Sequence, residues 1–199
     1  IKDYLGKPVY EWEKDTLRDQ IGVVHGLAWT AVGGVTLKIE VNVMPGKGGI
    51  QITGSLGDVM KESAQAAISY IRSQSKKYKI KNDFFEKHDI HIHIPEGAVP
   101  KDGPSAGITM TTAVLSAITG HKVYGNLAMT GEVTIRGDVL QIGGLKEKLL
   151  AAKRLGITKV LVPKMNEKDV KEFEEEVIEG LEIVYVKTMT QVIKEAFVH

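Results

Sequence analysis

The sequence predicts an α/β (α+β) domain in which mixed sheets are flanked by helices. Segments rich in branched and alternating apolar residues, typical of strands, dominate the first half of the chain. Strand and helix patterns interleave in the second half, as in layered α/β structures. Hydrophobic residues make up 43% of the 199 residues, enough for one substantial core.

The predicted elements follow one another in a regular order. Residues 1–19 are polar and contain Pro8, and we expect a connector there, before a folded body that begins near Ile21. Strand patterns then occur at 21–24, 27–32, 35–43, 50–54, 90–94, 126–135, 158–162 and 182–186. Helical patterns occur at 57–78, 104–119, 145–155, 166–177 and 189–197.

Two polar segments are assigned structural roles. The glycine-rich run at 46–49 lacks the spacing of a phosphate-binding P-loop, so we expect a hairpin turn and no ATP hydrolysis by this chain alone. The Lys/Glu-rich stretch at 164–176 predicts a solvated helical face.

The composition argues against several classes of function. A formal charge of +1 indicates neither a nucleic-acid partner nor an acidic membrane. Without cysteine the chain has no disulfide, thiol nucleophile or thiolate metal site. No apolar run approaches the ~20 residues that span a bilayer, and no secretory signal opens the chain. Because the chain begins with isoleucine, we expect it to be a piece of a longer protein.

Ser105 is the first candidate nucleophile. It lies in the run PKDGPSAG at 100–107, where Pro104 suits the first position of a helix that Gly120 ends. Free amides and the helix dipole at such a position can hold the oxyanion of an acyl-transfer intermediate. The alternative is that Ser105 only caps the helix. A catalytic serine also needs a base.

Lys148 is the candidate base. At about 100° per residue it falls within an apolar stripe of the helix 145–155, whereas Lys146 falls outside that stripe. The stripe consists of Leu145, Leu149, Ala152 and Leu155. Desolvation there would favour the neutral amine that a general base requires. The alternative is that the side chain snorkels past the stripe to water.

Other polar residues are assigned further roles. Asp102 either caps the helix that follows it or points into the site, and Glu40, at the end of a strand, is expected to reach the substrate groove. His91 and His93 leave the same face of one strand with zinc-like spacing, but no third ligand is obvious, so we predict a polar strand face and no metal. A Ser-His dyad remains the rival mechanism.

Three segments resemble the proteolytic domain of Lon, the ATP-dependent Ser-Lys protease of bacteria, archaea and organelles. Residues 95–107 are similar to its nucleophile segment, 129–137 to the strand and turn that follow, and 143–148 to its lysine helix. The likeness extends over about residues 20–187. It implies that Ser105 is the nucleophile, that Lys148 is its partner, and that Thr130 orients the lysine amine.

The resemblance also implies a biological setting. Residues 20–199 would be the Lon-type proteolytic domain, and residues 1–19 would connect it to a preceding ATPase module that uses ATP and Mg²⁺. The domain itself would need no cofactor. It would form a hexameric ring, cleave unfolded or damaged polypeptides and be cytoplasmic, with an organelle matrix as the other compartment. The competing function is a non-catalytic docking or ring-assembly domain of the same fold.

Overall fold

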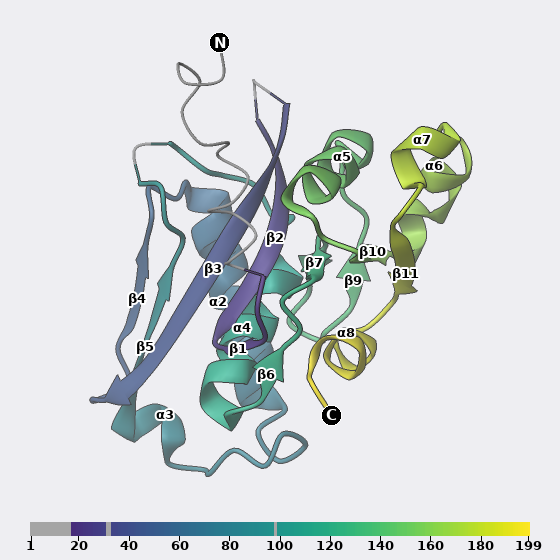
Figure 1. Ribbon diagram of the computed structural model, residues 1–199. Coiled ribbons are helices and arrows are strands. Elements are labelled where there is room, and N and C mark those ends of the chain that lie inside the picture. Colours follow the sequence, from purple (N-terminus) through teal and green to yellow (C-terminus); the bar gives the residue numbers. More distant parts are fainter. Residues whose placement is uncertain (1–16, 31–32, 98) are drawn as a thin grey trace, which may run out of the picture.

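The computed structural model describes residues 17–30, 33–97 and 99–199 (Figure 1). Within these residues, seven strands form one mixed sheet in the order β11-β10-β7-β2-β3-β5-β4. The strands are β2 (Val23–Thr30), β3 (Gly33–Pro45), β4 (Ile50–Thr53), β5 (His88–His93), β7 (Leu127–Met129), β10 (Lys159–Pro163) and β11 (Glu182–Val186). Strands β2, β7, β10 and β11 run parallel, whereas β3 is antiparallel to both β2 and β5. The predicted mixed α/β class is therefore confirmed.

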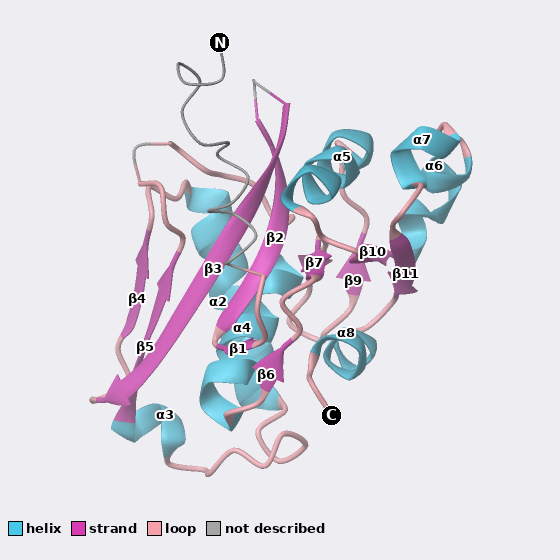
Figure 2. Cartoon of the chain, viewed as in Figure 1, coloured by secondary structure: helices cyan, strands magenta, loops and turns pink. Residues whose placement is uncertain are grey.

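Helices cover the sheet on two faces (Figure 2). The larger core cluster joins α2 (Asp58–Ser73), α4 (Gly107–Thr119) and α8 (Met189–Ala196), and the smaller joins α5 (Leu145–Leu155), α6 (Glu167–Lys171) and α7 (Glu175–Ile178). Alternate residues of β7 show the division, since Leu127 and Met129 belong to the larger cluster and Ala128 to the smaller. Such alternation follows from the two-residue period of a strand.

Short elements complete the described structure. Strand β1 (Gln20–Ile21) pairs with β6 (Lys122–Val123), and β8 (Glu132–Val133) pairs with β9 (Val139–Leu140). Helix α3 (Phe84–Lys87) precedes β5, and a 3-10 turn, η1 (Lys164–Asn166), follows β10. None of the helices in the described ranges is long and apolar enough to cross a membrane.

The predicted connector 1–19 lies mostly outside the described residues. Its last part is already attached to the body, because the Asp19 carboxylate accepts a hydrogen bond from the Gly125 backbone N–H at 2.9 Å. The predicted strand 27–32 likewise ends in residues that are not described, and its described part belongs to β2.

Several predicted boundaries were wrong because backbone groups bond outside the expected element. The strand predicted at 126–135 is divided at Thr130 and Gly131, since Gly131 bonds to the segment around Ser105 instead of continuing a ladder. Helix 104–119 begins only at Gly107, because Pro104–Ala106 form a turn closed by the Gly107 N–H donating to the Pro104 carbonyl at 3.1 Å. The helix predicted at 57–78 ends at Ser73.

One further structural prediction was wrong, and another was correct only in part. The run 46–49 is not a hairpin turn, because β5 lies between β3 and β4; the Asp89 carboxylate holds the loop by accepting from the N–H groups of Lys47 and Gly49. The charged side chains of the stretch 164–176 are largely exposed, as predicted, but the stretch is not one helix. It is divided into η1, α6 and the start of α7, and Val170 is buried in the smaller cluster.

Helix α5 lies very close to strand β3, and Gly34 permits this approach. A Cβ atom at Gly34 would lie 2.0 Å from the Glu147 carbonyl oxygen and 3.0 Å from the Lys148 backbone nitrogen. The Arg154 guanidinium adds a hydrogen bond of 2.7 Å to the Gly34 carbonyl. The position of Lys148 relative to the sheet therefore depends on a residue without a side chain.

We predict that Gly34→Ala destabilises the domain, because the added methyl group forces α5 away from the sheet. Overpacking of this kind lowers the free energy of unfolding by about 1–3 kcal/mol. Thermal unfolding followed by circular dichroism measures the effect. The matched control is Gly97→Ala, since a Cβ at Gly97 would meet no atom of the described residues beyond its chain neighbours within 4 Å. Equal unfolding midpoints for the two variants would contradict the prediction.

Candidate active site

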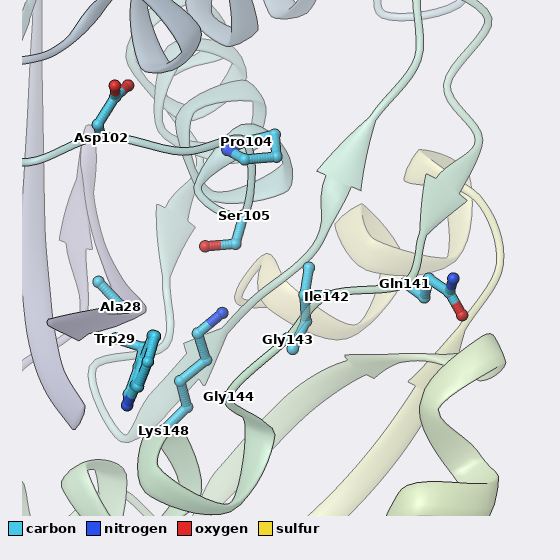
Figure 3. A pocket seen from close by; sticks show the side chains of 10 residues that line it. All are labelled: Ala28, Trp29, Asp102, Pro104, Ser105, Gln141, Ile142, Gly143, Gly144 and Lys148. Carbon is cyan, nitrogen blue, oxygen red and sulfur yellow. The ribbon is translucent and has the colours of Figure 1, made fainter. Parts of the chain in front are cut away.

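A cavity of about 590 Å³ lies beside the end of β2, and residues from three segments of the chain form its walls (Figure 3). These segments are the end of β2, the turn before α4, and the loop before α5 together with Lys148 in α5. The lining residues are Ala28, Trp29, Asp102, Pro104, Ser105, Gln141, Ile142, Gly143, Gly144 and Lys148. In open α/β sheets, ligands commonly bind outside the carboxyl ends of the parallel strands, and the carboxyl end of β2 lies here. We name this cavity the Ser105 pocket.

Ser105 lies in the turn that precedes α4 and is fixed there by its backbone. Its carbonyl accepts a hydrogen bond from the Gly131 N–H at 2.9 Å, and the Gly131 carbonyl accepts one from the Ile108 N–H at 3.1 Å. The capping alternative does not hold, because Ala106 is the N-cap and has no side-chain cap bond. Within the described residues the Ser105 hydroxyl makes no hydrogen bond, and so it is available to a ligand.

The backbone around Ser105 offers hydrogen-bond donors. In the described part of the chain, the N–H groups of Ser105 and Ala106 donate no hydrogen bond to protein atoms. Helix α4 begins two residues after Ser105, at Gly107. Its first turn packs closely on β8 because Gly107 has no side chain; a Cβ there would lie 2.8 Å from the Val133 backbone nitrogen. Free amides at the positive end of a helix suit a developing oxyanion.

Lys148 enters the pocket from α5. The helix has the predicted bounds, with Gly144 before it at φ 65° and Gly156 after it at φ 90°. Lys148 is only 3% exposed and shares the buried face predicted for it, whereas Lys146 is exposed. Burial lowers the pKa of the Lys148 amine to about 8, because desolvation penalises the ammonium form.

The amine and the hydroxyl approach each other from different walls of the pocket. In Figure 3 the Lys148 side chain extends toward Ser105, whose hydroxyl points into the same space. No hydrogen bond joins the two groups among the described residues. In proteases without a bound substrate, the hydrogen bond between nucleophile and base is often long or absent and forms only in the complex. The arrangement can pass a proton from a hydroxyl to an amine.

Thr130 supplies a buried hydroxyl and directly precedes Gly131, whose N–H binds the Ser105 carbonyl. It follows β7 directly, is 0% exposed, and its backbone N–H donates to the Leu161 carbonyl at 3.2 Å. Its Oγ1 atom is the one buried side-chain polar atom without a hydrogen-bond partner in the described residues. An unpaired buried hydroxyl costs stability, so a functional reason for it is to be sought.

Asp102 caps a helix, but not the one that was predicted. Its carboxylate accepts hydrogen bonds from the Met60 N–H in the first turn of α2 at 3.0 Å and from the Gly103 N–H at 2.8 Å. Although Asp102 lines the pocket, its carboxylate points away from Ser105 in Figure 3. The carboxylate therefore ties the serine segment to α2.

Glu40 lies away from the Ser105 pocket, contrary to the expectation that it reaches the groove. It pairs in register with Val23 at the start of β2, whereas the pocket lies at the other end of that strand. Its carboxylate forms an ion pair with Lys38 at 3.2 Å. Glu40 instead borders a separate hollow of about 270 Å³ together with His91 and His93.

The two histidines share a strand face, as predicted. Both rings contact the Thr53 hydroxyl, His91 through Nε2 at 2.8 Å and His93 through Nδ1 at 2.6 Å. No group of three or more metal-binding side chains is found in the part of the chain that the structure describes. No histidine is among the described residues that line the Ser105 pocket, and this argues against a Ser-His dyad.

Sequence reasoning missed Asn166, which supports the pocket from behind. This side chain is 2% exposed, and its amide pairs with both backbone groups of Ile142, accepting from the N–H at 3.0 Å and donating to the carbonyl at 2.9 Å. Ile142 is part of the pocket wall. The one signal in the sequence was its position just after a strand at the carboxyl edge of the sheet.

Comparison with known proteins identifies the family. Residues 1–199 match the model of the Lon protease (S16) C-terminal proteolytic domain. The chain is 64% identical over 198 residues to a Lon protease of Lachnoclostridium phytofermentans, of which it covers 24%. It is 60% identical over 196 residues to that of Clostridioides difficile, covering 25%, and 55% identical over 198 residues to Lon protease 1 of Bacillus subtilis, covering 26%.

These alignments cover 98–100% of this chain, which thus spans about a quarter of the length of the relatives. The family match and the identities agree with the mixed α/β sheet and with the resemblance of the three sequence segments. The chain belongs to the family of Lon protease C-terminal proteolytic domains, which are serine endopeptidases.

Proposed function

We propose that this chain hydrolyses peptide bonds through an ester of Ser105, with the neutral amine of Lys148 as the general base. The observation that carries the proposal is the buried Lys148 amine, with its pKa lowered to about 8, facing the Ser105 hydroxyl in one pocket. Lys148 takes the hydroxyl proton as Oγ attacks the scissile carbonyl, and it returns that proton to the leaving amine. Water then hydrolyses the ester by the same route.

The surroundings of the dyad have distinct proposed roles. The free N–H groups of Ser105 and Ala106 receive the tetrahedral oxyanion. Thr130 orients the Lys148 amine. The Thr130 hydroxyl is buried and has no hydrogen-bond partner among the described residues, so it is available to bind the amine. Asp102 holds the serine segment against α2 and takes no part in proton transfer.

The whole protein has a wider proposed function. We propose that residues 1–19 connect residues 20–199 to an ATPase module, which uses ATP and Mg²⁺ to unfold substrates. The relatives are about four times as long as this chain, and this length leaves room for such a module. We further propose a hexameric ring that degrades unfolded or damaged polypeptides in the bacterial cytoplasm. Sedimentation of the full-length protein with and without ATP tests the ring.

The second candidate is a docking domain of the same fold without catalysis. The Ser105 hydroxyl, which makes no hydrogen bond among the described residues, and the desolvated Lys148 amine argue against it, since a docking surface requires neither. A fluorophosphonate reagent decides between the two functions, because it labels only an activated serine. Folded chain whose Ser105 is not labelled would favour the docking domain.

We predict that Ser105→Ala abolishes peptide cleavage and leaves the fold intact. The hydroxyl makes no hydrogen bond in the described structure, so its loss should change the free energy of unfolding by less than about 0.5 kcal/mol. Hydrolysis of a fluorogenic peptide and thermal unfolding measure the two effects. Lys146→Ala, on the exposed face of α5, is the control and should retain activity. Cleavage by purified Ser105→Ala would refute the nucleophile.

We predict that activity rises with pH through about 8, the pKa of Lys148, because only the neutral amine accepts the serine proton. Below this pH the ammonium predominates and the rate falls. Lys148→Arg should be inactive, because a guanidinium stays protonated although its charge is the same. Peptide hydrolysis from about pH 6 to 10, with circular dichroism as a folding control, tests both statements. An active arginine variant would show that charge alone is required.

We predict that Thr130→Val lowers kcat but not stability. Valine has nearly the shape of threonine, and the hydroxyl that it removes is buried without a hydrogen-bond partner among the described residues. Because we propose that this hydroxyl orients the amine during the reaction, its loss should reduce kcat by about tenfold or more. The activity midpoint in the pH profile should shift as well. Wild-type kcat with an unchanged pH midpoint would exclude a role in orienting Lys148.

A further inference from the structure

Lys101 is a second buried lysine, and its environment differs from that of Lys148. It is 8% exposed, and its ammonium donates three hydrogen bonds to backbone carbonyls, those of Gly54 at 3.0 Å, Glu96 at 2.7 Å and Val99 at 2.9 Å. An ammonium has three protons, so all of its donors are used. Among the described residues no carboxylate lies within ion-pair distance of it.

The three carbonyls come from two separate stretches of the chain. Gly54 follows the edge strand β4, whereas Glu96 and Val99 belong to the loop after β5. The backbone of Lys101 adds to the connection, since its N–H donates to Ser55 at 3.0 Å and its carbonyl accepts from Gly57 at 2.7 Å. Lys101 therefore joins the loop after β5 to the segment between β4 and α2.

The loop that Lys101 holds has strained backbone at Glu96. This residue has φ 69°, in the left-handed region of backbone conformation that residues other than glycine rarely adopt. Strained backbone persists only where surrounding contacts maintain it. The hydrogen bond from the Lys101 ammonium to the Glu96 carbonyl is one such contact.

The same loop borders a second cavity of about 440 Å³, which adjoins the Ser105 pocket. The two cavities share Ala28, Trp29 and Asp102. The loop contributes Glu96, Val99, Pro100 and Lys101 to the second cavity, and apolar residues of β3 and α2 form other parts of its lining. A polypeptide bound across Ser105 and extended along the end of β2 would reach this space, because the two cavities lie side by side there and share three lining residues.

We propose that Lys101 is a positioning residue for the substrate chain. By holding the carbonyls of Gly54, Glu96 and Val99, it fixes the loop that borders the second cavity, and so it sets the affinity for a peptide and not the chemistry at Ser105. The inference rests on the proposed peptidase function. Lys101 is no alternative base, because all three of its protons are bound by carbonyls, whereas the Lys148 amine has no such partners among the residues that the structure describes.

Three variants test this role: Lys101→Met, which removes the donors but keeps the length; Lys101→Arg, which keeps donors and charge; and Lys61→Met, a control on the exposed face of α2. For each we measure KM and kcat with a fluorogenic decapeptide and the rate at which a small fluorophosphonate labels Ser105. All rates are expressed per labelled site, which removes differences in the folded fraction. Hydrogen exchange of residues 96–101 reports the order of the loop.

Lys101→Met should raise KM by about tenfold, with kcat and the labelling rate within about twofold of wild type. Exchange in the loop should become faster. Lys101→Arg should have a KM close to that of the wild type. If Lys101→Met does not fold and yields no labelled sites, the KM of Lys101→Arg tests the positioning role instead. Lys61→Met should match wild type in every measurement.

An unchanged KM in Lys101→Met, or a parallel loss of kcat and labelling, would overturn the positioning role. An arginine variant as impaired as the methionine variant would also overturn it, because hydrogen bonding would then not be what Lys101 contributes. Wild-type chain whose Ser105 is not labelled would remove the proposed peptidase function itself, which separates the two failures.

Discussion

The proposed chemistry depends on the desolvation of one amine. Lowering the pKa of Lys148 from 10.5 to about 8 corresponds to roughly 3 kcal/mol against the ammonium form. The unfolded chain binds more protons than the folded chain between these two pH values, so the stability contributed by this group rises with pH across that interval and is absent below it. At neutral pH the fold therefore bears a cost in stability, and the neutral amine becomes available at a much lower pH than for an ordinary lysine.

The close packing of α5 on the sheet produces this desolvation. Gly34 lets the helix backbone reach β3, and the apolar face of α5 fills the smaller cluster on that side of the sheet. Ser105 reaches the pocket from the other side, since it precedes α4, which packs in the larger cluster. Lys148 and Ser105 thus come from opposite faces of the sheet and line the same pocket at its end. Gly131 holds the Ser105 turn in place through two backbone hydrogen bonds, one to the Ser105 carbonyl and one from the Ile108 N–H.

Features fixed by local sequence were predicted well. The bounds of α5, its glycine ends, and the burial of Lys148 with exposure of Lys146 follow from helical periodicity and backbone conformation alone. The mixed α/β class follows from the order of strand and helix patterns. The helix start and the helical periodicity indicated Ser105 and Lys148, and the resemblance to the family supported both and added Thr130.

Features that depend on strand order could not be predicted. The location of Glu40 at the far end of β2 depends on the register of two strands, and the loop at 46–49 depends on β5 lying between β3 and β4. Asp102 caps α2, a helix that begins more than forty residues earlier, so no nearby pattern could reveal its partner. The same holds for Asn166 and Ile142, whose contact links two distant loops.

The pKa of the Lys148 amine is the most direct test of this account. In chain labelled with ¹³C and ¹⁵N at lysine, the Lys148 signal can be assigned by its absence from Lys148→Arg, and the Ser105→Ala background prevents self-cleavage during the titration. We expect Lys148 to titrate near 8. Titration near 10.5, the ordinary value of a lysine amine, would show that the amine is not desolvated and would contradict the proposed base.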